Sequence, residues 1–219
     1  MSSEYSHIPR QGPEALEFAH AVVHIVEAGV ADPLVVSTLK EHAYDGAVTL
    51  IAATKSLDSA EGAERVAKEA EEVCEADADA AVRAGFGFAG LRGGTEARLL
   101  LRAVCGGRTY GELVRLSGQE QVLAMRSFVN QARESADRFG LTENHLDAID
   151  TTNEALSVTS IAASDAARVT AAARLARREA ETSFIKCTRV SNKILTALVS
   201  REVLATQIPR FKRTASAQS

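Results

Sequence analysis

The pattern closest to a catalytic or metal-binding site is a polar stripe on an otherwise apolar segment near the start of the chain. Glu17, His20, His24 and Glu27 follow one another at intervals of three, four and three residues, which places them on one face of a helix. Carboxylates and imidazoles at such spacing are ligands in metal-binding helical bundles, and His42 could add another. Those bundles need two Glu-x-x-His pairs and further glutamates, so the stripe fits the solvent edge of a helix better. We predict no cofactor and keep His20, His24, Glu27 and His42 as weak candidate metal ligands.

A second group with chemical potential is the set of cations near the C-terminus. Residues 1–150 contain 14 basic and 24 acidic side chains, whereas residues 151–219 contain 11 basic and 5 acidic ones. A basic segment of this kind can bind an anionic partner such as nucleic acid, or it can be neutralised by the acidic part of the chain or of another copy. The candidate anion-binding or nucleic-acid-binding residues are Arg174, Arg177, Arg178, Lys186, Arg189, Lys193, Arg210, Lys212 and Arg213.

Residues 109–133 have the spacing of a helix-turn-helix. Residues 109–116 would form the first helix and residues 117–118 the turn, and the second helix would present Gln119, Gln121 and Arg126 to DNA. Residues 109–118 resemble a short piece of the DNA-binding half of alkylguanine-DNA alkyltransferases. The resemblance covers about ten residues, and the family's Pro-Cys-His-Arg active-site motif is absent, so it implies no alkyl transfer. The alternative is a loop that leads into another bundle helix.

Residues 85–90 match the pattern G-x-G-x-x-G. In dinucleotide-binding proteins this pattern follows a strand and opens a helix, but here the preceding residues favour a helix. We therefore expect these glycines to mark a close helix crossing or a helix end.

The longest uninterrupted segment of the sequence is its last third. Between Gly140 and Pro209, 68 consecutive residues contain neither glycine nor proline, and the segment is rich in alanine, arginine and leucine, which favour helices. We predict a largely continuous helix over 143–206, with a kink near residue 150 as an alternative. At 1.5 Å per residue, a helix over the whole segment would be about 100 Å long.

The sequence as a whole predicts an all-α protein, an elongated helical bundle of five or six helices with one very long C-terminal helix. Few stretches alternate polar and apolar residues as strands do. We expect a flexible N-terminus over 1–12, a single bundle domain over 13–207 and a disordered basic tail over 208–219. The expected earlier helices cover residues 13–29, 32–57, 58–91, 95–105 and 118–139.

Helical spacing also predicts which faces are buried. For the third helix we predict a buried stripe in which Asp77 needs a partner such as an arginine. This stripe consists of Ala63, Val66, Ala70, Val73, Asp77, Ala80, Ala84, Phe88 and Leu91. For the last helix we predict one stripe of Leu146, Ile149, Asn153, Leu156, Ser160 and Ala163. A second stripe there contains Ala162, Val169, Ala173, Ala176, Ala180, Phe184, Cys187, Ser191, Ile194 and Leu198.

No nucleophile, acid–base pair or C-x-x-C motif stands out, so the sequence favours a non-enzymatic role. The three cysteines fit reduced thiols in a cytoplasmic protein, and no apolar segment is long enough to span a bilayer. We expect a structural or scaffold protein that self-associates as a homo-oligomer, because a very long helix would leave apolar surface uncovered by neighbours of only about 20–33 residues. The acidic third helix would complement the basic last one. The alternatives are a nucleic-acid-associated protein using residues 109–133 and the basic C-terminal helix, and a metal-binding bundle.

Overall fold

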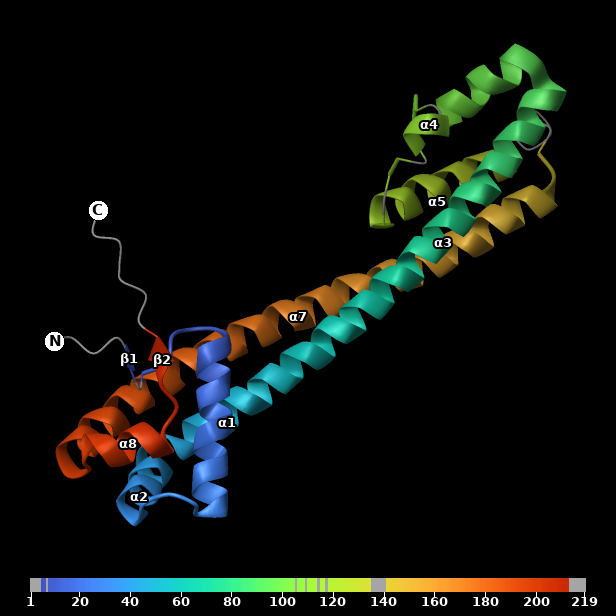
Figure 1. Ribbon diagram of the computed structural model, residues 1–219. Helices are drawn as coiled ribbons and strands as arrows, with labels where there is room; N and C mark the ends of the chain where they lie inside the picture. The colour runs from blue at the N-terminus through green and yellow to red at the C-terminus, as the bar shows by residue number, and fades with distance from the viewer. Residues whose placement is uncertain are drawn as a thin grey trace, which may run out of the picture. The chain divides into compact units, whose positions relative to one another are not determined.

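The computed structural model describes residues 5–6, 8–104, 106–108, 110–113, 115–116, 118–134 and 141–212. These residues form an all-α protein with a very long C-terminal helix, as predicted (Figure 1). A two-residue antiparallel pairing of β1 with β2 accompanies the helices. The elements are β1 (Tyr5–Ser6), α1 (Pro13–Ala28), α2 (Pro33–His42), α3 (Tyr44–Val104), α4 (Tyr110–Leu113), α5 (Gly118–Glu134), α7 (Glu143–Leu198), α8 (Arg201–Gln207) and β2 (Phe211–Lys212).

The helix α3 is the main departure from the sequence prediction. It extends over 61 residues and passes through both expected breaks, at residues 58–59 and 93–94. Leu57 and Ala60 are buried on either side of Asp58 and Ser59, and packing of this kind overrides the preference of Asp and Ser for helix ends. A glycine inside a helix costs only about 1 kcal/mol relative to alanine. The expected second helix ends at His42, because the residues from Tyr44 onward belong to α3.

The helix α7 continues without a break past residue 150. It ends at Leu198, eight residues before the predicted end. Ser200 has extended backbone angles, and its hydroxyl accepts a hydrogen bond from the Val203 amide, which starts α8. A serine at such a position satisfies an amide that would otherwise lack a partner. The predicted helix over 143–206 is therefore two helices.

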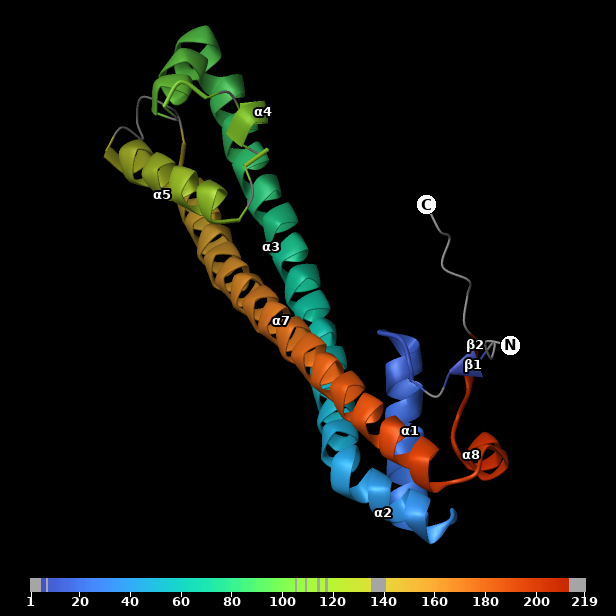
Figure 2. The ribbon, with the colours of Figure 1, turned by 90° about the vertical axis from the view of Figure 1, so that its left-hand side faces the viewer.

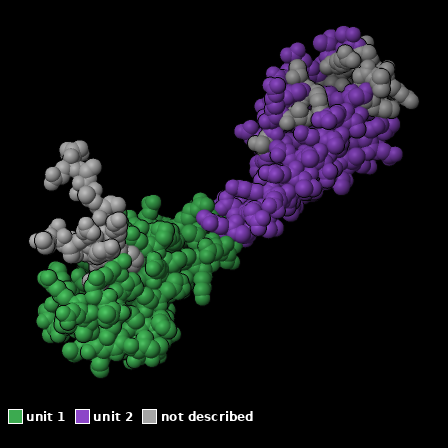
Figure 3. Space-filling model, in the orientation of Figure 1, with its two compact units in different colours: residues 1–60, 170–219 green, residues 61–169 purple. Residues whose placement is uncertain are grey.

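The contacts of the chain separate into two compact units, coloured in Figure 3. The first unit comprises residues 1–60 and 170–219, and the second comprises residues 61–169. The expectation of one bundle domain over 13–207 stays a prediction.

The core of the first unit forms where α1, α2, the start of α3 and the end of α7 meet. Phe18 of α1 and Phe184 of α7 have ring centroids 6.1 Å apart, and both are buried with Leu39. A Cβ on Gly46 would lie 3.4 Å from the Phe184 ring, so a small residue at this position allows the close approach of α3 to α7. Buried aromatic and leucine side chains supply most of the hydrophobic stabilisation available here.

Proline and glycine define the ends of α1 and α2. Pro13 and Pro33 occupy first-turn positions of these helices, where a missing amide hydrogen costs nothing. Gly29 closes α1 in the left-handed conformation with φ 61°, which favours glycine. The Asp32 side chain accepts a hydrogen bond from the Leu34 amide at 2.9 Å and so caps α2.

In the second unit, α5 packs against α3 and α7. Phe86 of α3 and Phe128 of α5 have ring centroids 5.3 Å apart. A Cβ on Gly85 would lie 3.1 Å from Cδ1 of Ile149 in α7. This close approach confirms, at Gly85, the predicted helix crossing in the G-x-G-x-x-G pattern. Nothing lies within 4 Å of a Cβ on Gly87.

Within this unit, α3 and α7 lie side by side in both ribbon views (Figure 1 and Figure 2). The first stripe predicted for the last helix is confirmed: Leu146, Ile149, Asn153, Leu156, Ser160 and Ala163 are all buried. They recur at alternating intervals of three and four residues, the spacing of a helix that pairs with another along its length. Ala78 of α3 packs with Leu156 of α7 in this seam.

The second predicted stripe of α7 is only partly correct. Ala180, Phe184 and Ser191 are buried, but Val169 and Leu198 are 55% and 59% exposed. The buried seam instead follows Thr170, Glu181, Thr188 and Leu195, together with Phe184 and Ser191. Polar residues are tolerated there because they form hydrogen bonds: the Thr170 hydroxyl donates to the Ala60 carbonyl at 3.1 Å, and the Glu181 carboxylate accepts from the Gly12 amide.

Arg133 joins the end of α5 to the start of α7. Its guanidinium donates hydrogen bonds to Glu143 at 2.9 Å, Asp147 at 2.8 Å and Asp150 at 3.2 Å. These hydrogen bonds, the one with Glu143 first, raise the pKa of Arg133 further above its already high value. Because three carboxylates lie on successive turns of α7, one arginine fixes the rotation of α5 about its axis.

Candidate interaction surfaces

The exposed face of α3 in the second unit carries an apolar stripe that the sequence analysis placed in the core. Val66 and Val73 are each 61% exposed, and the small residues between and beyond them are exposed as well. The residues of this face whose side chains the structure describes are all exposed, so their predicted burial is wrong. We call them the α3 stripe: Ala63, Val66, Ala70, Val73, Asp77, Ala80 and Ala84. Phe88 and Leu91 have side chains outside the described part.

The buried face of the same segment lies about a quarter turn away. Ala78 and Val82 are each 1% exposed, and Cys74 packs against the cluster that contains Ala78. Both faces have helical spacing and small side chains, so spacing alone could not tell which one α7 would cover. The exposure of Asp77 also removes its need for a buried arginine.

Acidic side chains lie within and beside the α3 stripe. Glu69 lies three residues after Val66 and four before Val73, and Asp77 lies four after Val73, so both carboxylates neighbour Val73 on the helix surface. Glu69 pairs with Arg65 of its own helix at 3.6 Å, with both side chains largely exposed. Among the described residues no salt bridge involves Asp77. Exposed pairs of this kind contribute little.

Further around α3, the pKa of the Glu75 side chain is shifted by its surroundings. Partial burial raises the pKa of the Glu75 carboxyl above its ordinary value of 4.5, and the neighbouring charges of Asp79, Glu71 and Glu72 raise it further. Burial disfavours the charged form, and like charges do the same. The carboxylates around Glu75 thus crowd one another.

Of the cations predicted to bind an anionic partner, four lie on one side of α7 in the first unit. Arg178, Lys186, Arg189 and Lys193 are exposed, and their intervals of eight, three and four residues place them on one side of α7. None of them forms a salt bridge within the described part of the chain. We call these four residues the α7 basic stripe. Leu175 at its start and Val190 beside it are 57% and 48% exposed.

The other predicted cations lie elsewhere. Arg174 is exposed beside the stripe, whereas Arg177 is half-buried with an Nε that lacks a hydrogen-bond partner. Arg210 is exposed after α8. The side chain of Lys212 and all of Arg213 lie outside the described part, so the structure brings together four of the nine candidates.

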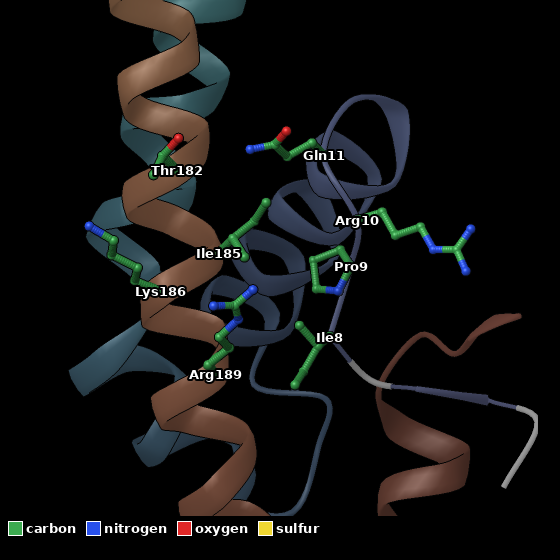
Figure 4. A pocket seen from close by; sticks show the side chains of 8 residues that line it. All are labelled: Ile8, Pro9, Arg10, Gln11, Thr182, Ile185, Lys186 and Arg189. Carbon is green, nitrogen blue, oxygen red and sulfur yellow. The ribbon is translucent and has the colours of Figure 1, made fainter. Parts of the chain in front are cut away.

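A cavity of about 600 Å³ lies beside the α7 basic stripe, lined by residues 8–11 and by four residues of α7. Figure 4 shows the Arg189 guanidinium between α7 and the segment of residues 8–11, with the Gln11 amide on the same side. The Lys186 side chain points away from the segment of residues 8–11, and Arg10 points away from α7. The cations around this cavity therefore do not converge on one point inside it.

The histidine stripe is where the sequence placed it, on the surface of α1, but it does not form a metal centre. His20, His24 and Glu27 are exposed, and Glu27 accepts a hydrogen bond from the Tyr44 hydroxyl at 2.8 Å. That hydrogen bond is the largest of the effects that raise the pKa of Tyr44. The His42 Nε2 lies 3.8 Å from a carboxylate oxygen of Glu41. In the described residues no group of three or more potential ligands could hold a metal ion.

The residues predicted to face DNA in the helix-turn-helix interpretation are used inside the second unit. Gln121 is 1% exposed, and its amide donates to Asp79 at 2.7 Å. Gln119 donates to the Ser157 carbonyl, and Arg126 pairs with Glu154 at 3.3 Å. The described part of the preceding helix α4 is Tyr110–Leu113. Thr109, Val114 and Ser117 lie outside the described residues.

Burial of Gln121 in α5 was not predicted, whereas Asn153 of α7 was expected in the buried stripe. Besides Gln121, Asn153 is 2% exposed and donates to the Val122 carbonyl at 3.2 Å. Each of these two amides keeps one buried oxygen without a hydrogen-bond partner. Asn153 could be found from its place in the apolar repeat of α7, whereas nothing in the sequence around Gln121 indicates burial.

Cys74 and Cys187 are free and half-buried, in line with the predicted reduced thiols, and Cys105 lies outside the described residues. No helix in the described part is long and apolar enough to cross a membrane. Comparisons with protein-family models, curated proteins and solved structures found no match to this chain.

Proposed function

We propose that this protein is a non-enzymatic scaffold that self-associates through the α3 stripe. The observation that carries the proposal is the exposure of Val66 and Val73, each 61% accessible, in a line of small residues that continues for about six helical turns. A contiguous apolar surface with polar borders is typical of an interface. The partner is a second copy of the chain.

The structure changes the physical reason for this proposal. From the sequence, the long C-terminal helix was expected to lack neighbours of comparable length. In the structure, α3 has 61 residues and packs against the inner face of α7 in each unit. Uncovered apolar surface lies on the outer face of α3, and α7 adds exposed side chains of its own at Val158, Ile161, Val169 and Leu175. Full burial of one valine contributes about 1.5–2 kcal/mol, so two half-exposed valines and several alanines support weak, concentration-dependent association rather than an obligate dimer.

Sedimentation velocity over about 1–100 µM protein tests this proposal, a range that covers weak association. The variant with Val66→Glu and Val73→Glu places two charges in the stripe, and we expect it to stay monomeric where the wild type associates. Asn130→Glu, at an exposed position of α5, is the control for an added carboxylate and should associate like the wild type. A wild type that is monomeric over the whole range would contradict the proposal.

One observation supports a second candidate function, nucleic-acid association. The four exposed cations of the α7 basic stripe lack salt bridges in the described residues, and phosphates would bind them with an affinity that falls steeply with salt. Residues 109–133 add no support for nucleic-acid binding, because Gln119, Gln121 and Arg126 form hydrogen bonds or ion pairs within the second unit. A gel shift that is lost when Arg178 and Arg189 become glutamine would favour this function.

A further inference from the structure

We propose that the surface that receives the α3 stripe is the α7 basic stripe of another copy, with Val73 packed against Val190. This inference rests on the proposed self-association and specifies its geometry. The contact is heterologous, since it joins the second unit of one copy to the first unit of the next.

Charge is the first argument. The first unit contains 13 basic and 11 acidic residues, and the second contains 12 basic and 18 acidic residues. Two α3 stripes placed face to face would bring like charges together, which opposes binding. The acidic border of the α3 stripe and the α7 basic stripe attract each other instead, and such complementarity speeds encounter and excludes wrong partners.

The local pattern around the two valines is the second argument. Val73 is flanked by Glu69 four residues before and Asp77 four residues after. Val190 is flanked by Lys186 four residues before and Lys193 three residues after, and all three of these side chains are exposed. Each surface is therefore an exposed valine between two charges of one sign, and the signs are opposite.

The spacing of these charges also agrees. Glu69 and Asp77 are eight residues apart, which is about 12 Å along a helix, and Lys186 and Lys193 are seven apart, about 10.5 Å. Both carboxylates of one copy can therefore lie opposite both ammonium groups of the other. The Lys186 side chain points away from the segment of residues 8–11 (Figure 4), so this segment does not occupy its position.

A charge-exchange experiment with the full chain tests the contact. One variant carries Lys186→Glu and Lys193→Glu, and the other carries Glu69→Lys and Asp77→Lys. At 50 mM salt we expect each variant alone to associate at least about tenfold more weakly than the wild type, because each would place like charges across the contact. An equimolar mixture of the two should associate again, since every contact between unlike variants joins opposite charges. The variant with Lys40→Glu and Lys55→Glu, at exposed positions of the first unit away from the stripe, is the control and should behave as the wild type.

The outcomes separate the two proposals. If both charge variants associate like the wild type while Val66→Glu with Val73→Glu does not, self-association stands and the contact with α7 is overturned. If the wild type is monomeric, both proposals fail. If Lys186→Glu with Lys193→Glu leaves association unchanged but abolishes binding to duplex DNA, the α7 basic stripe is a nucleic-acid surface and the proposed contact is wrong.

Discussion

Val66 and Val82 are the same residue type on the same helix and in the same unit, yet they differ completely in burial. Val66 is 61% exposed, whereas Val82 is 1% exposed and packs in the core with Phe128 and Ile149. Truncating each valine to alanine removes the same two methyl groups. The pair therefore tests directly which face of α3 is the inner one.

The expected effects have opposite signs. At Val82, loss of two buried methyl groups removes about 1.6 kcal/mol of transfer free energy, and the cavity left behind brings the total to about 2–3 kcal/mol of destabilisation. At Val66 almost no burial is lost, and alanine is the better helix former by up to about 0.7 kcal/mol. Val66→Ala should thus be neutral or slightly stabilising.

Urea denaturation followed by circular dichroism gives the free energy of unfolding of each variant. Measurements near 1 µM protein keep association from contributing, and a repeat with Val73→Ala checks a second member of the α3 stripe. If Val66→Ala and Val73→Ala lowered the free energy of unfolding as much as Val82→Ala under these conditions, the assignment of faces would be wrong. An effect of Val66→Ala that appears only at high protein concentration would instead indicate burial in an interface.

Three further predictions concern the core of the first unit and the charges of the second unit. Phe184→Ala should destabilise the first unit by about 3–5 kcal/mol in a denaturant titration, because the buried ring packs against Phe18 and Gly46. The raised pKa of Glu75 means that the folded state binds this proton more tightly than the unfolded state, so its penalty is present at neutral pH and is relieved as pH falls toward 4.5. Glu75→Gln should therefore raise the melting temperature at pH 7 and lose that advantage near pH 4.5; an equal gain at both values would contradict it. Arg133→Gln should lower the melting temperature at low salt and lower it less at 1 M salt, because this guanidinium forms ion pairs with three exposed carboxylates. A decrease in melting temperature that is independent of salt would contradict a contribution from these ion pairs.

The candidate surfaces were only partly visible in the sequence. The cations of α7 could be found from composition, and four of them share one face because their spacing is helical. The α3 stripe was recognised as a stripe but assigned to the core. Two interpretations of residues 109–133 stayed open in the sequence, and the burial of Gln121 against Asp79 favours a bundle helix. In both cases the answer depends on what the side chains meet, and these contacts come from residues far away in the sequence.

The sequence by itself determined the helical class, the unbroken helix beyond residue 143, the buried repeat from Leu146 to Ala163 and the close crossing at Gly85. These properties follow from local causes: helix propensity, the absence of glycine and proline, and side-chain period. Only the tertiary structure decided that α3 continues through Asp58 and Gly93, and that Val82 rather than Val66 faces α7. Two faces of one alanine-rich helix offer nearly equal apolar area, so the neighbour that packs there selects between them.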